Sequence, residues 1–326
     1  MNRRQFLSRL AGYGAAGAAL LYSPLRLFGA QMRPNSGFVG SNAATLQGKA
    51  DKVQAALAFP YLVALRGGSP EKMFSAGIAA LGGMGRFVRP GSSVVVKPNI
   101  GWDVPPERAA TTNPALVASV VEACLAAGAK RVYVLDHPCD TWQACYKNSG
   151  IEGAAKAAGA TVAPAAAESY FHEVAVKGSK VLTSVKVHEL ILAADALINV
   201  PVLKSHGGAG MTCALKNLMG TVWNREEFHF KGLDTCIAEV ALAVRPTLTV
   251  VDASKVMLTG GPRGHGGSQY AQLDMQILCP DIVAADAAAA KAFGSGPGAF
   301  EYIGRAAALK LGTDNLDSLD IRRIVL

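Results

Sequence analysis

Three features of the sequence predict an α/β fold with a mostly parallel, open sheet that carries helices on both faces. Short runs rich in Val, Ile and Leu alternate with helical patterns from about residue 60 onward. Residues 92–137 follow the order strand, helix, strand, and such a unit forms parallel strands with a right-handed crossover. The chain has 326 residues, 50% of them hydrophobic and 17% charged, which suits a single domain over 57–326 with a large core.

Strands are expected where a short apolar run is bounded by Gly, Pro or a polar cluster. Pro98, for example, ends the run SSVVVK, because proline cannot donate to a central ladder. Alternating polar and apolar residues over 171–189 predict a small β-hairpin that turns at Gly178. In chain order the other expected strands are 59–68, 92–99, 130–137, 160–164, 194–204, 247–254 and 320–326.

Helices are expected where 3.6-residue periodicity lies between a start signal and a stop signal. Ser69 followed by Pro70 is one such start, and Pro114 lies in the first turn of a second helix that Gly128 ends. A further helix begins near Thr212. In chain order the longer expected helices are 69–81, 112–129, 150–159, 235–245, 281–294 and 299–312.

The first thirty residues resemble a twin-arginine (Tat) export signal. Arg3 and Arg4 precede a mild apolar stretch, AGYGAAGAALL. We therefore predict a signal peptide over 1–30, a linker over 31–56, transport by the Tat translocase, and a periplasmic or otherwise exported location. An ordinary amphipathic helix at the amino terminus is the alternative.

The charge distribution argues against nucleic-acid binding. Four arginines in the first thirty residues supply half of the net charge of +8, and the remaining basic residues are dispersed. No other stretch is long and apolar enough to span a bilayer, so we expect no stable membrane span after signal cleavage.

Polar residues follow four of the expected strands at the point where each strand ends. In open parallel sheets, ligands bind outside the carboxyl ends of the strands. A shared site is therefore expected there, although each residue alone could serve as a turn cap or as a solvated surface group. The residues are Lys97 and Asn99, Asp136 and His137, Lys204 and His206, and Asp252.

Lysines and glycines within this set predict a site for an anion. Lys97, Lys204 and Lys216 are expected to face one pocket, and backbone N–H groups at a helix start favour anions as well. Gly207 and Gly208 would let the backbone approach the ligand closely.

Two further segments complete the predicted ligand site. Asn99 and Asn217 are expected to orient the ligand. Arg263 lies in the loop GGPRGHGG, which forms either a lid over the ligand or a plain surface turn.

A metal centre is a second hypothesis for the same region. His206 follows Lys204 by two residues, so on a strand both side chains point to one face. His206, Asp252 and Cys213 are the predicted ligands, and a divalent metal or an iron–sulfur cluster is the cofactor they would hold. Asp136, His137 and Cys139 could complete the set. No standard zinc spacing is present, and each His could instead be a structural residue.

The six cysteines allow several roles. Cys124 lies on an apolar helix face and is expected to be inert core. Cys139 and Cys145 are expected to form a disulfide after export, with redox activity or cluster ligation together with Cys213 as alternatives.

Five segments in this order resemble domain-of-unknown-function family 362. They are VVVKPNIG, ATTNPALVASVVEACLAAGAKRVYVLD, ADALINVPVLKSH…CALKNLMG, VVDA…GGPRG and DIVAADAAAAKAFG. The resemblance extends from about residue 60 to the carboxyl terminus and implies a fold and a motif set but no reaction. Some members resemble iron–sulfur proteins through a ferredoxin-like Cys cluster. This chain has no C-x2-C-x2-C run, so the resemblance does not imply that cofactor here.

Three functions remain open on these residues. The first is an exported enzyme for an anionic substrate, in which lysines neutralise charge and His206 acts as acid, base or metal ligand. In this enzyme Asp136 or Asp252 would orient His206 or bind the metal. The second is a redox or cofactor-carrying protein with cysteine ligands. The third is a non-catalytic anion-binding protein. Neither a P-loop nor a serine nucleophile elbow is present.

Overall fold

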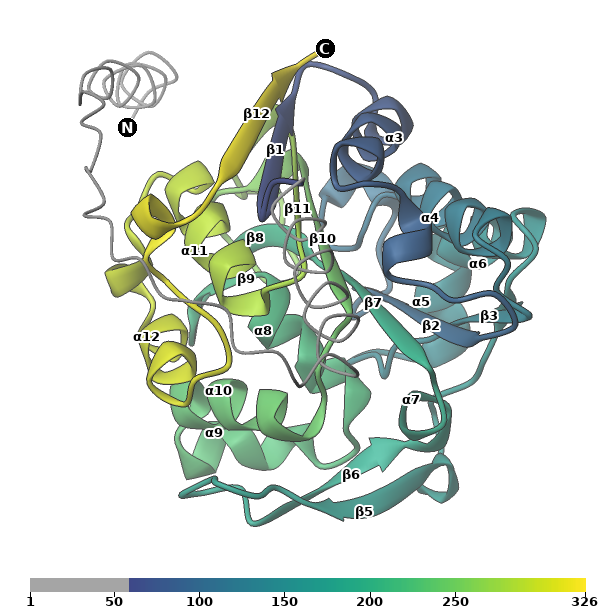
Figure 1. The fold of residues 1–326 in the computed structure, drawn as a ribbon. Coiled ribbons are helices and arrows are strands. Elements are labelled where there is room, and N and C mark those ends of the chain that lie inside the picture. Colours follow the sequence, from purple (N-terminus) through teal and green to yellow (C-terminus); the bar gives the residue numbers. More distant parts are fainter. Residues whose placement is uncertain (1–58) are drawn as a thin grey trace, which may run out of the picture. The chain divides into compact units, whose positions relative to one another are not determined.

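The structure is a computed structural model that describes residues 59–326. A ten-stranded sheet forms the centre of this part of the chain (Figure 1). The predicted signal peptide and the whole predicted linker lie outside these residues. Along the sheet the strands are β12 (Ile321–Val325), β1 (Leu62–Arg66), β11 (Tyr270–Cys279), β10 (Leu248–Met257), β7 (Ala196–Val200), β2 (Ser93–Pro98), β3 (Arg131–Val134) and β4 (Thr161–Val162).

Most neighbouring strands are parallel, which confirms the predicted fold class. The run from β10 through β7, β2 and β3 to β4 is parallel throughout, as is the pair of β1 and β12. Among the eight strands given above, β11 is the exception, since it is antiparallel to both β1 and β10. The parallel strands are flanked by helices, so both of their faces are buried, which explains their continuous apolar sequences.

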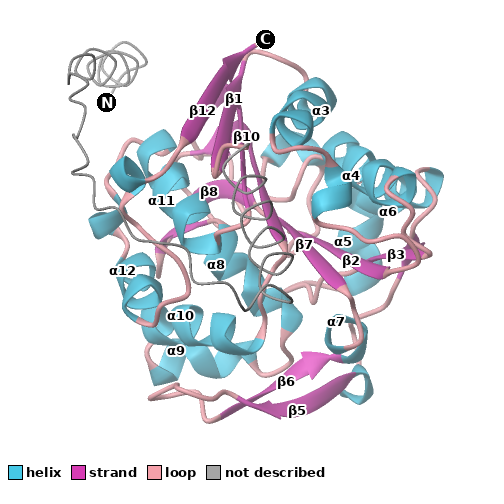
Figure 2. Ribbon diagram, in the orientation of Figure 1, coloured by secondary structure: helices cyan, strands magenta, loops and turns pink. Residues whose placement is uncertain are grey.

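Helices cover both faces of this sheet (Figure 2). One face carries α3 (Pro70–Ala80), α4 (Pro114–Ala126) and α6 (Ile151–Ala157), whose apolar residues pack with Val94, Val96 and Leu278 in one core. The other face carries α8 (Ala214–Asn217), α10 (Leu233–Ala243), α11 (Ile282–Ala292) and α12 (Glu301–Ala308). The shorter helices are α5 (Trp142–Asn148), α7 (Glu189–Leu192) and α9 (Phe228–Lys231). Among residues 59–326, no helix is long and apolar enough to cross a membrane.

Start signals in the sequence act as predicted. The Ser69 side chain accepts a hydrogen bond from the backbone N–H of Lys72 at 3.4 Å, and Asn113 accepts one from Ala115 at 2.9 Å. Each cap is followed by a proline, whose missing N–H has no partner to lose in the first helical turn.

The run predicted as one strand over 194–204 forms two. β7 ends at Val200, and after Pro201 the chain continues as β8 (Val202–His206), which pairs with β10. A proline cannot donate a ladder hydrogen bond, so it marks the break. β9 (Gly210–Thr212) then folds back antiparallel on β8; its three residues are too few to show a strand pattern.

Among the elements longer than four residues, β11 and α5 were not predicted. β11 carries polar residues at irregular positions, and Asp274 within it has a φ of 48°, so it shows no clean alternation. α5 lies in a segment for which no helix was expected, because its seven residues span only two turns and show little periodicity.

The predicted hairpin is present as a separate two-stranded sheet of β5 (Phe171–Ala175) and β6 (Ser184–His188). Gly178 lies between the two strands with a φ of 86°. The carboxylate of Glu239, which is 1% exposed on α10, accepts backbone N–H groups of the segment that returns from this turn. Its partners are Lys180 at 2.6 Å, Val181 at 3.0 Å and Leu182 at 2.8 Å.

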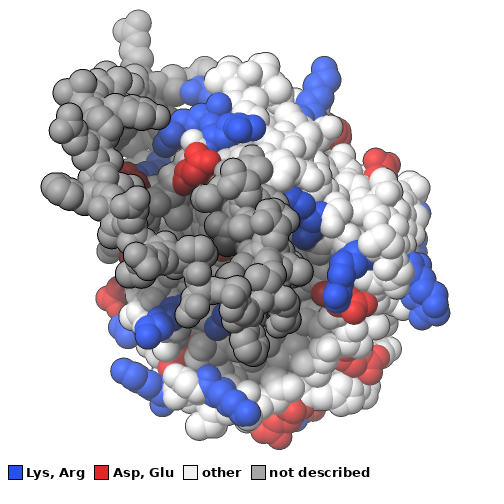
Figure 3. Space-filling view, viewed as in Figure 1, with Lys and Arg blue, Asp and Glu red and all other residues white. Residues whose placement is uncertain are grey.

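Charged side chains are interspersed on the visible surface. Over most of the described part of the face in Figure 3, Lys and Arg are separated by uncharged and acidic residues.

Glu239→Gln should detach the hairpin from α10. The amide would turn an N–H₂ group toward backbone N–H donors, and a buried unpaired donor costs about 1–3 kcal/mol. Urea unfolding should show that loss, and hydrogen exchange should become faster at residues 179–188 but not in β10. Glu152→Gln, which removes only an exposed ion pair with Lys156, is the control. Equal unfolding free energies for the two variants would contradict the assignment.

A candidate anion-binding pocket

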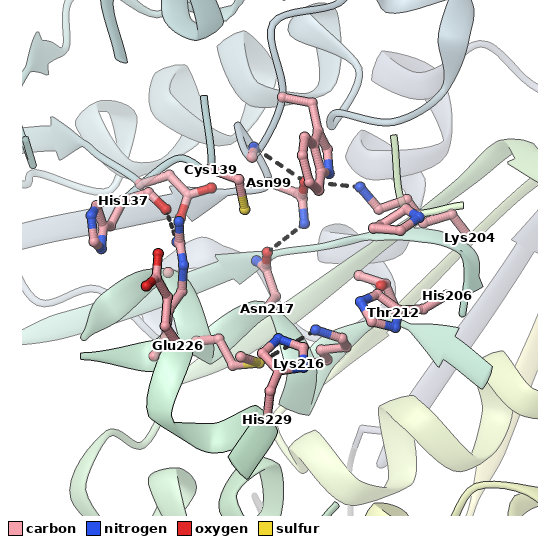
Figure 4. Close-up of a pocket in the computed structure, with 17 residues that line it drawn as sticks. Asn99, His137, Cys139, Lys204, His206, Thr212, Lys216, Asn217, Glu226 and His229 are labelled. Atoms are coloured by element: carbon pink, nitrogen blue, oxygen red, sulfur yellow. Dashed lines mark hydrogen bonds between the residues drawn. The ribbon is translucent and has the colours of Figure 1, made fainter. Parts of the chain in front are cut away.

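A pocket of about 350 Å³ lies at the carboxyl ends of β2, β3 and β8 (Figure 4). This volume is within the range of small-molecule sites in proteins. Six of the predicted site residues line it, and they come from three strand ends and from α8. They are Asn99, Asp136, Lys204, His206, Lys216 and Asn217.

Lys97 lies beneath this pocket in a buried ion pair. Its Nζ is 2.7 Å from Oδ1 of Asp136, and it also donates to the carbonyl of Pro98 at 3.0 Å and to Oδ1 of Asn217 at 2.9 Å. The other oxygen of Asp136 accepts the N–H of Ile100 at 2.6 Å. Burial lowers the pKa of Lys97 and the Asp136 carboxylate opposes that change. With three acceptors, this ammonium has no N–H left for a ligand.

The two asparagines connect the lysines to each other. Asn99 donates from Nδ2 to Oδ1 of Asn217 at 3.1 Å, and its own Oδ1 accepts from Nζ of Lys204 at 3.2 Å. Asn217 in turn donates to the carbonyl of Lys97 at 3.2 Å and to Asn199 at 2.8 Å. Both side chains line the pocket, and the hydrogen bonds hold their amide groups in one orientation.

Lys204 has only neutral partners. Its Nζ donates to Oδ1 of Asn99 and to the carbonyl of Ala110, and the side chain is 1% exposed. Burial lowers the pKa of Lys204 to about 7, and the positive charges of Lys216 and Lys97 act in the same direction.

Lys216 is the second lysine that lines the pocket, and it too has no carboxylate partner among residues 59–326. Its contact is the sulfur of Met219, 3.3 Å from Nζ. Burial lowers the pKa of Lys216 to about 8, with Arg225 and Lys97 adding to the effect. Two amines that titrate near neutral pH therefore line one pocket.

His206 is held as a neutral imidazole. Its Nδ1 accepts the N–H groups of Gly208 and Ala209, each at 3.0 Å, so the ring proton is on Nε2. Burial lowers the pKa of His206 to about 3, and Lys216 and Lys204 contribute. At neutral pH this side chain is a hydrogen-bond donor, and protonation at Nδ1 would break two backbone hydrogen bonds.

The pocket also contains residues that were not assigned to an anion site from sequence. Arg225 and Glu226 come from a short 3-10 turn, and the Arg225 guanidinium donates to the carbonyls of His137 and Pro138. His229 follows on α9, and Thr212 lies directly opposite Lys204 in the β8–β9 ladder. Had the β8–β9 hairpin been recognised in the sequence, its register would have placed Thr212 beside Lys204 and so at the site. The segment 225–229, in contrast, has no sequence pattern that indicates a position at the edge of the sheet. Trp102 also lines the pocket, as do two residues that the sequence had suggested, His137 for the shared site and Cys139 for the metal set.

Asp252 does not reach this pocket. β10 continues five residues beyond it, to Met257, so the carboxylate lies within a strand rather than at its end. It accepts the N–H of Asn113 at 2.8 Å and that of Ser254 at 3.1 Å. Burial raises the pKa of Asp252, and its contacts fix the start of α4 instead of a ligand.

The start of α8 is also closed to a ligand. Asp286, which is 0% exposed on α11, accepts the N–H groups of Ala214 and Leu215 at 2.7 and 2.9 Å. Cys213 is fully buried beside the same carboxylate, and burial raises its thiol pKa. The backbone donors that a helix start would offer to an anion are therefore used within the fold.

The predicted glycine and arginine contacts differ from expectation. Gly208 donates its N–H to His206, and neither it nor Gly207 lines the pocket. Arg263 is half exposed beside the pocket and pairs with Asp140 at 3.3 Å, while the adjacent Pro262 forms part of the lining. Gly208 therefore helps to position His206, and Arg263 makes an ion pair beside the pocket.

The predicted metal ligands do not come together. His206 lines the pocket, but Cys213 and Asp252 are buried elsewhere with other partners. Within residues 59–326, no three His, Cys, Asp or Glu side chains form a group that could hold a metal ion. This donor set does not fit a metal centre or a cluster, and we derive no step through one.

The predicted disulfide is not present, since all six cysteines are free. Cys145 is fully buried on the inner face of α5, whereas Cys139 is exposed and lines the pocket. The helix that was not predicted explains the error, because it turns the Cys145 side chain into the core. Cys124 is buried in the core, as its helical position predicted.

Gly220→Ala should disrupt the buried ion pair. A Cβ at this position would lie 1.8 Å from Oδ1 of Asp136 and 2.8 Å from Nζ of Lys97. Breaking a buried pair costs about 3–5 kcal/mol, and urea unfolding measures it. The control is Gly153→Ala in α6, where a Cβ meets no atom within 4 Å, and it should stabilise by about 0.5–1 kcal/mol. Wild-type stability in Gly220→Ala would show that the pair is not essential.

Comparison with known proteins gives a family and distant structural likenesses. A family with the description "Domain of unknown function (DUF362)" matches residues 94–291. "Thylakoid-associated protein sll1697" of Synechocystis sp. is 29% identical over 215 residues, which are 63% of this chain and 64% of that protein. The match thus spans less than two thirds of the relative's own length.

Two solved structures show weaker similarity. The lactate racemase apoprotein of Thermoanaerobacterium thermosaccharolyticum has a TM-score of 0.38 and 11% identity, covering 64% of this chain and 54% of its own. A Thermotoga maritima protein has a TM-score of 0.44 and 13% identity, covering 70% of this chain and 60% of its own. These TM-scores are too low to carry a functional argument. The family match covers more than half of the sequence, and the chain therefore belongs to the DUF362 family, as its motifs predicted.

Proposed function

We propose that the pocket binds a small anionic ligand with a carboxylate or phosphate group. One observation carries this proposal: Lys204 and Lys216 line the same pocket without a carboxylate partner, while Lys97 is already neutralised by Asp136. Two neighbouring ammonium groups repel each other and lower each other's pKa. An anion between them would replace this repulsion by attraction.

Neutral donors and a further charge complete the proposed site. His206 presents a ring N–H, and Arg225 adds positive charge to the lining of the pocket. Glu226 also lines the pocket and reduces its net positive charge. This balance favours a ligand with one or two negative charges over a polyanion such as nucleic acid.

Lys216→Met should weaken binding of oxalate and inorganic phosphate at pH 6.5 by at least about tenfold, since hydrogen bonds to charged groups contribute about 1.5–3 kcal/mol. Lys204→Met should do the same. For the wild type, affinity should fall as pH rises through about 7 and 8, because the anion prefers the protonated lysines. Isothermal titration calorimetry measures both effects.

Lys156→Met is the matched control, because Lys156 is an exposed lysine paired with Glu152 on α6. Its affinity for both anions should equal that of the wild type. Unchanged affinity in both pocket variants, or tight binding that is independent of pH between 6 and 9, would contradict the proposal.

We also propose that the protein is exported. The support is the twin arginine and the apolar stretch in residues 1–30. Replacing both Arg3 and Arg4 by Lys should retain the protein in the cytoplasm of a host with a Tat system, as measured by fractionation and immunoblotting. A variant with Arg9→Lys serves as control. Equal periplasmic amounts of the double variant and the wild type would contradict export by this route.

A further inference from the structure

We infer that the anion bound in this pocket carries an aldehyde or ketone next to its carboxylate, as in a 2-oxo acid, and that Lys204 condenses with that carbonyl to form an imine. The inference rests on the proposed anion-binding function and adds to it the chemical class of ligand and a covalent step.

The first argument is the contrast between two buried lysines, Lys97 and Lys204. Lys97 has three acceptors, one of them a carboxylate, which is the arrangement for an ammonium group. Lys204 has two acceptors, Asn99 Oδ1 and the Ala110 carbonyl, and both are neutral. A neutral amine has two N–H bonds and one lone pair.

The hydrogen bonds of Lys204 therefore leave one position on Nζ without a protein partner. Both N–H bonds of the neutral amine are used on the wall, so the lone pair is directed away from those acceptors. Lys204 lines the pocket, which is where a carbonyl carbon would have to lie. Burial lowers the pKa of Lys204 to about 7, so a large share of the amine is unprotonated at neutral pH.

The second argument is an unpaired hydroxyl next to this amine. Thr212 is 4% exposed and lines the pocket, and its Oγ1 has no hydrogen-bond partner in the described part of the chain. Thr212 is directly opposite Lys204 in the β8–β9 ladder, and side chains of such pairs start about 5 Å apart. A buried hydroxyl without a partner is costly, so this one points to a ligand oxygen.

The third argument is that the same hairpin also presents a ring donor. His206 and Lys204 are two residues apart on β8, and both line the pocket, as Figure 4 shows together with Thr212. Lys216 supplies the countercharge from α8. Thr212 and His206 thus offer hydrogen bonds, and Lys216 offers charge, to a carboxylate that lies close to Nζ of Lys204. In a 2-oxo acid the carboxylate is bonded to the carbonyl carbon, which matches that short separation.

The proposed step is balanced without an additional reactant. The lone pair of Lys204 Nζ attacks the carbonyl carbon, and a C–N bond forms. The carbonyl oxygen leaves as water together with the two hydrogens of the amine, and a C=N bond remains. No group is oxidised or reduced, and hydrolysis returns the lysine and the ligand. The Asn99 and Ala110 acceptors release their hydrogens as the imine forms.

Reductive trapping tests the step on the full chain. The protein is incubated with pyruvate and sodium cyanoborohydride at pH 7.5, which reduces an imine to a stable secondary amine, and labelled peptides are identified by mass spectrometry. We expect Lys204 to be labelled at least about tenfold faster than any exposed lysine, the factor that corresponds to about 1.4 kcal/mol. Acetone, which has no carboxylate, should lose this selectivity.

Substitutions at Lys216 and Thr212 test whether the ligand's carboxylate is recognised, separately from the reaction of its carbonyl with Lys204. Lys216→Met and Thr212→Val should each slow labelling of Lys204 by pyruvate, the first by about tenfold or more, because the carboxylate loses a partner. Lys156→Met should leave the rate unchanged. Circular dichroism and urea unfolding check that each variant is folded. The comparison of pyruvate with acetone uses the wild-type protein, so it holds even if a variant fails to fold.

Each outcome is decisive. Selective labelling of Lys204 that depends on Lys216 supports the inference. Normal oxalate binding without selective labelling by pyruvate or 2-oxoglutarate overturns it and leaves the proposed anion-binding function intact. Selective labelling that is the same with acetone overturns the carboxylate assignment. The absence of both oxalate binding and labelling contradicts the two proposals together.

Discussion

The buried ion pair of Lys97 and Asp136 is the interaction on which the site depends. It joins the ends of β2 and β3, and through Asn217 it also fixes α8. Removing two charges from water is expensive, and the cost is recovered only when every donor and acceptor has a partner. Here Pro98, Asn217 and Ile100 supply those partners. The absence of a side chain at position 220 leaves the space in which the pair forms.

This ion pair distinguishes Lys97, which lies beneath the pocket, from the two lysines that line it. Lys97 is neutralised by its own carboxylate, whereas Lys204 and Lys216 contact only neutral groups. The fold therefore keeps two amines near their titration points, where small changes in the surroundings alter their protonation. His206 contributes a ring proton that two backbone N–H groups hold on Nε2. The proposed nucleophile, Lys204, and the ring donor, His206, thus come from the β8–β9 hairpin, and the charge of Lys216 comes from α8.

The sequence predicted the features that depend on local patterns. Strands, their parallel order and the polar residues at their ends follow from apolar runs and from the geometry of open sheets. Lys204 and His206 were placed on one face by their spacing alone. Long-range contacts could not be predicted in this way. The carboxylate of Asp286 caps α8 from about seventy positions away in the chain, and Asp252 proved to lie inside a longer strand. The residues from the turn at 225–229 reach the pocket only through packing.

The most direct test of the central claim is the titration of the lysine side chains by NMR, with ¹³C-labelled Cε atoms, in the absence and presence of oxalate. The account predicts two lysine signals with midpoints near pH 7 and 8, assigned by the Lys204→Met and Lys216→Met variants, and an upward shift of both midpoints when oxalate binds. Midpoints above pH 10 for both lysines, unaffected by oxalate, would contradict it.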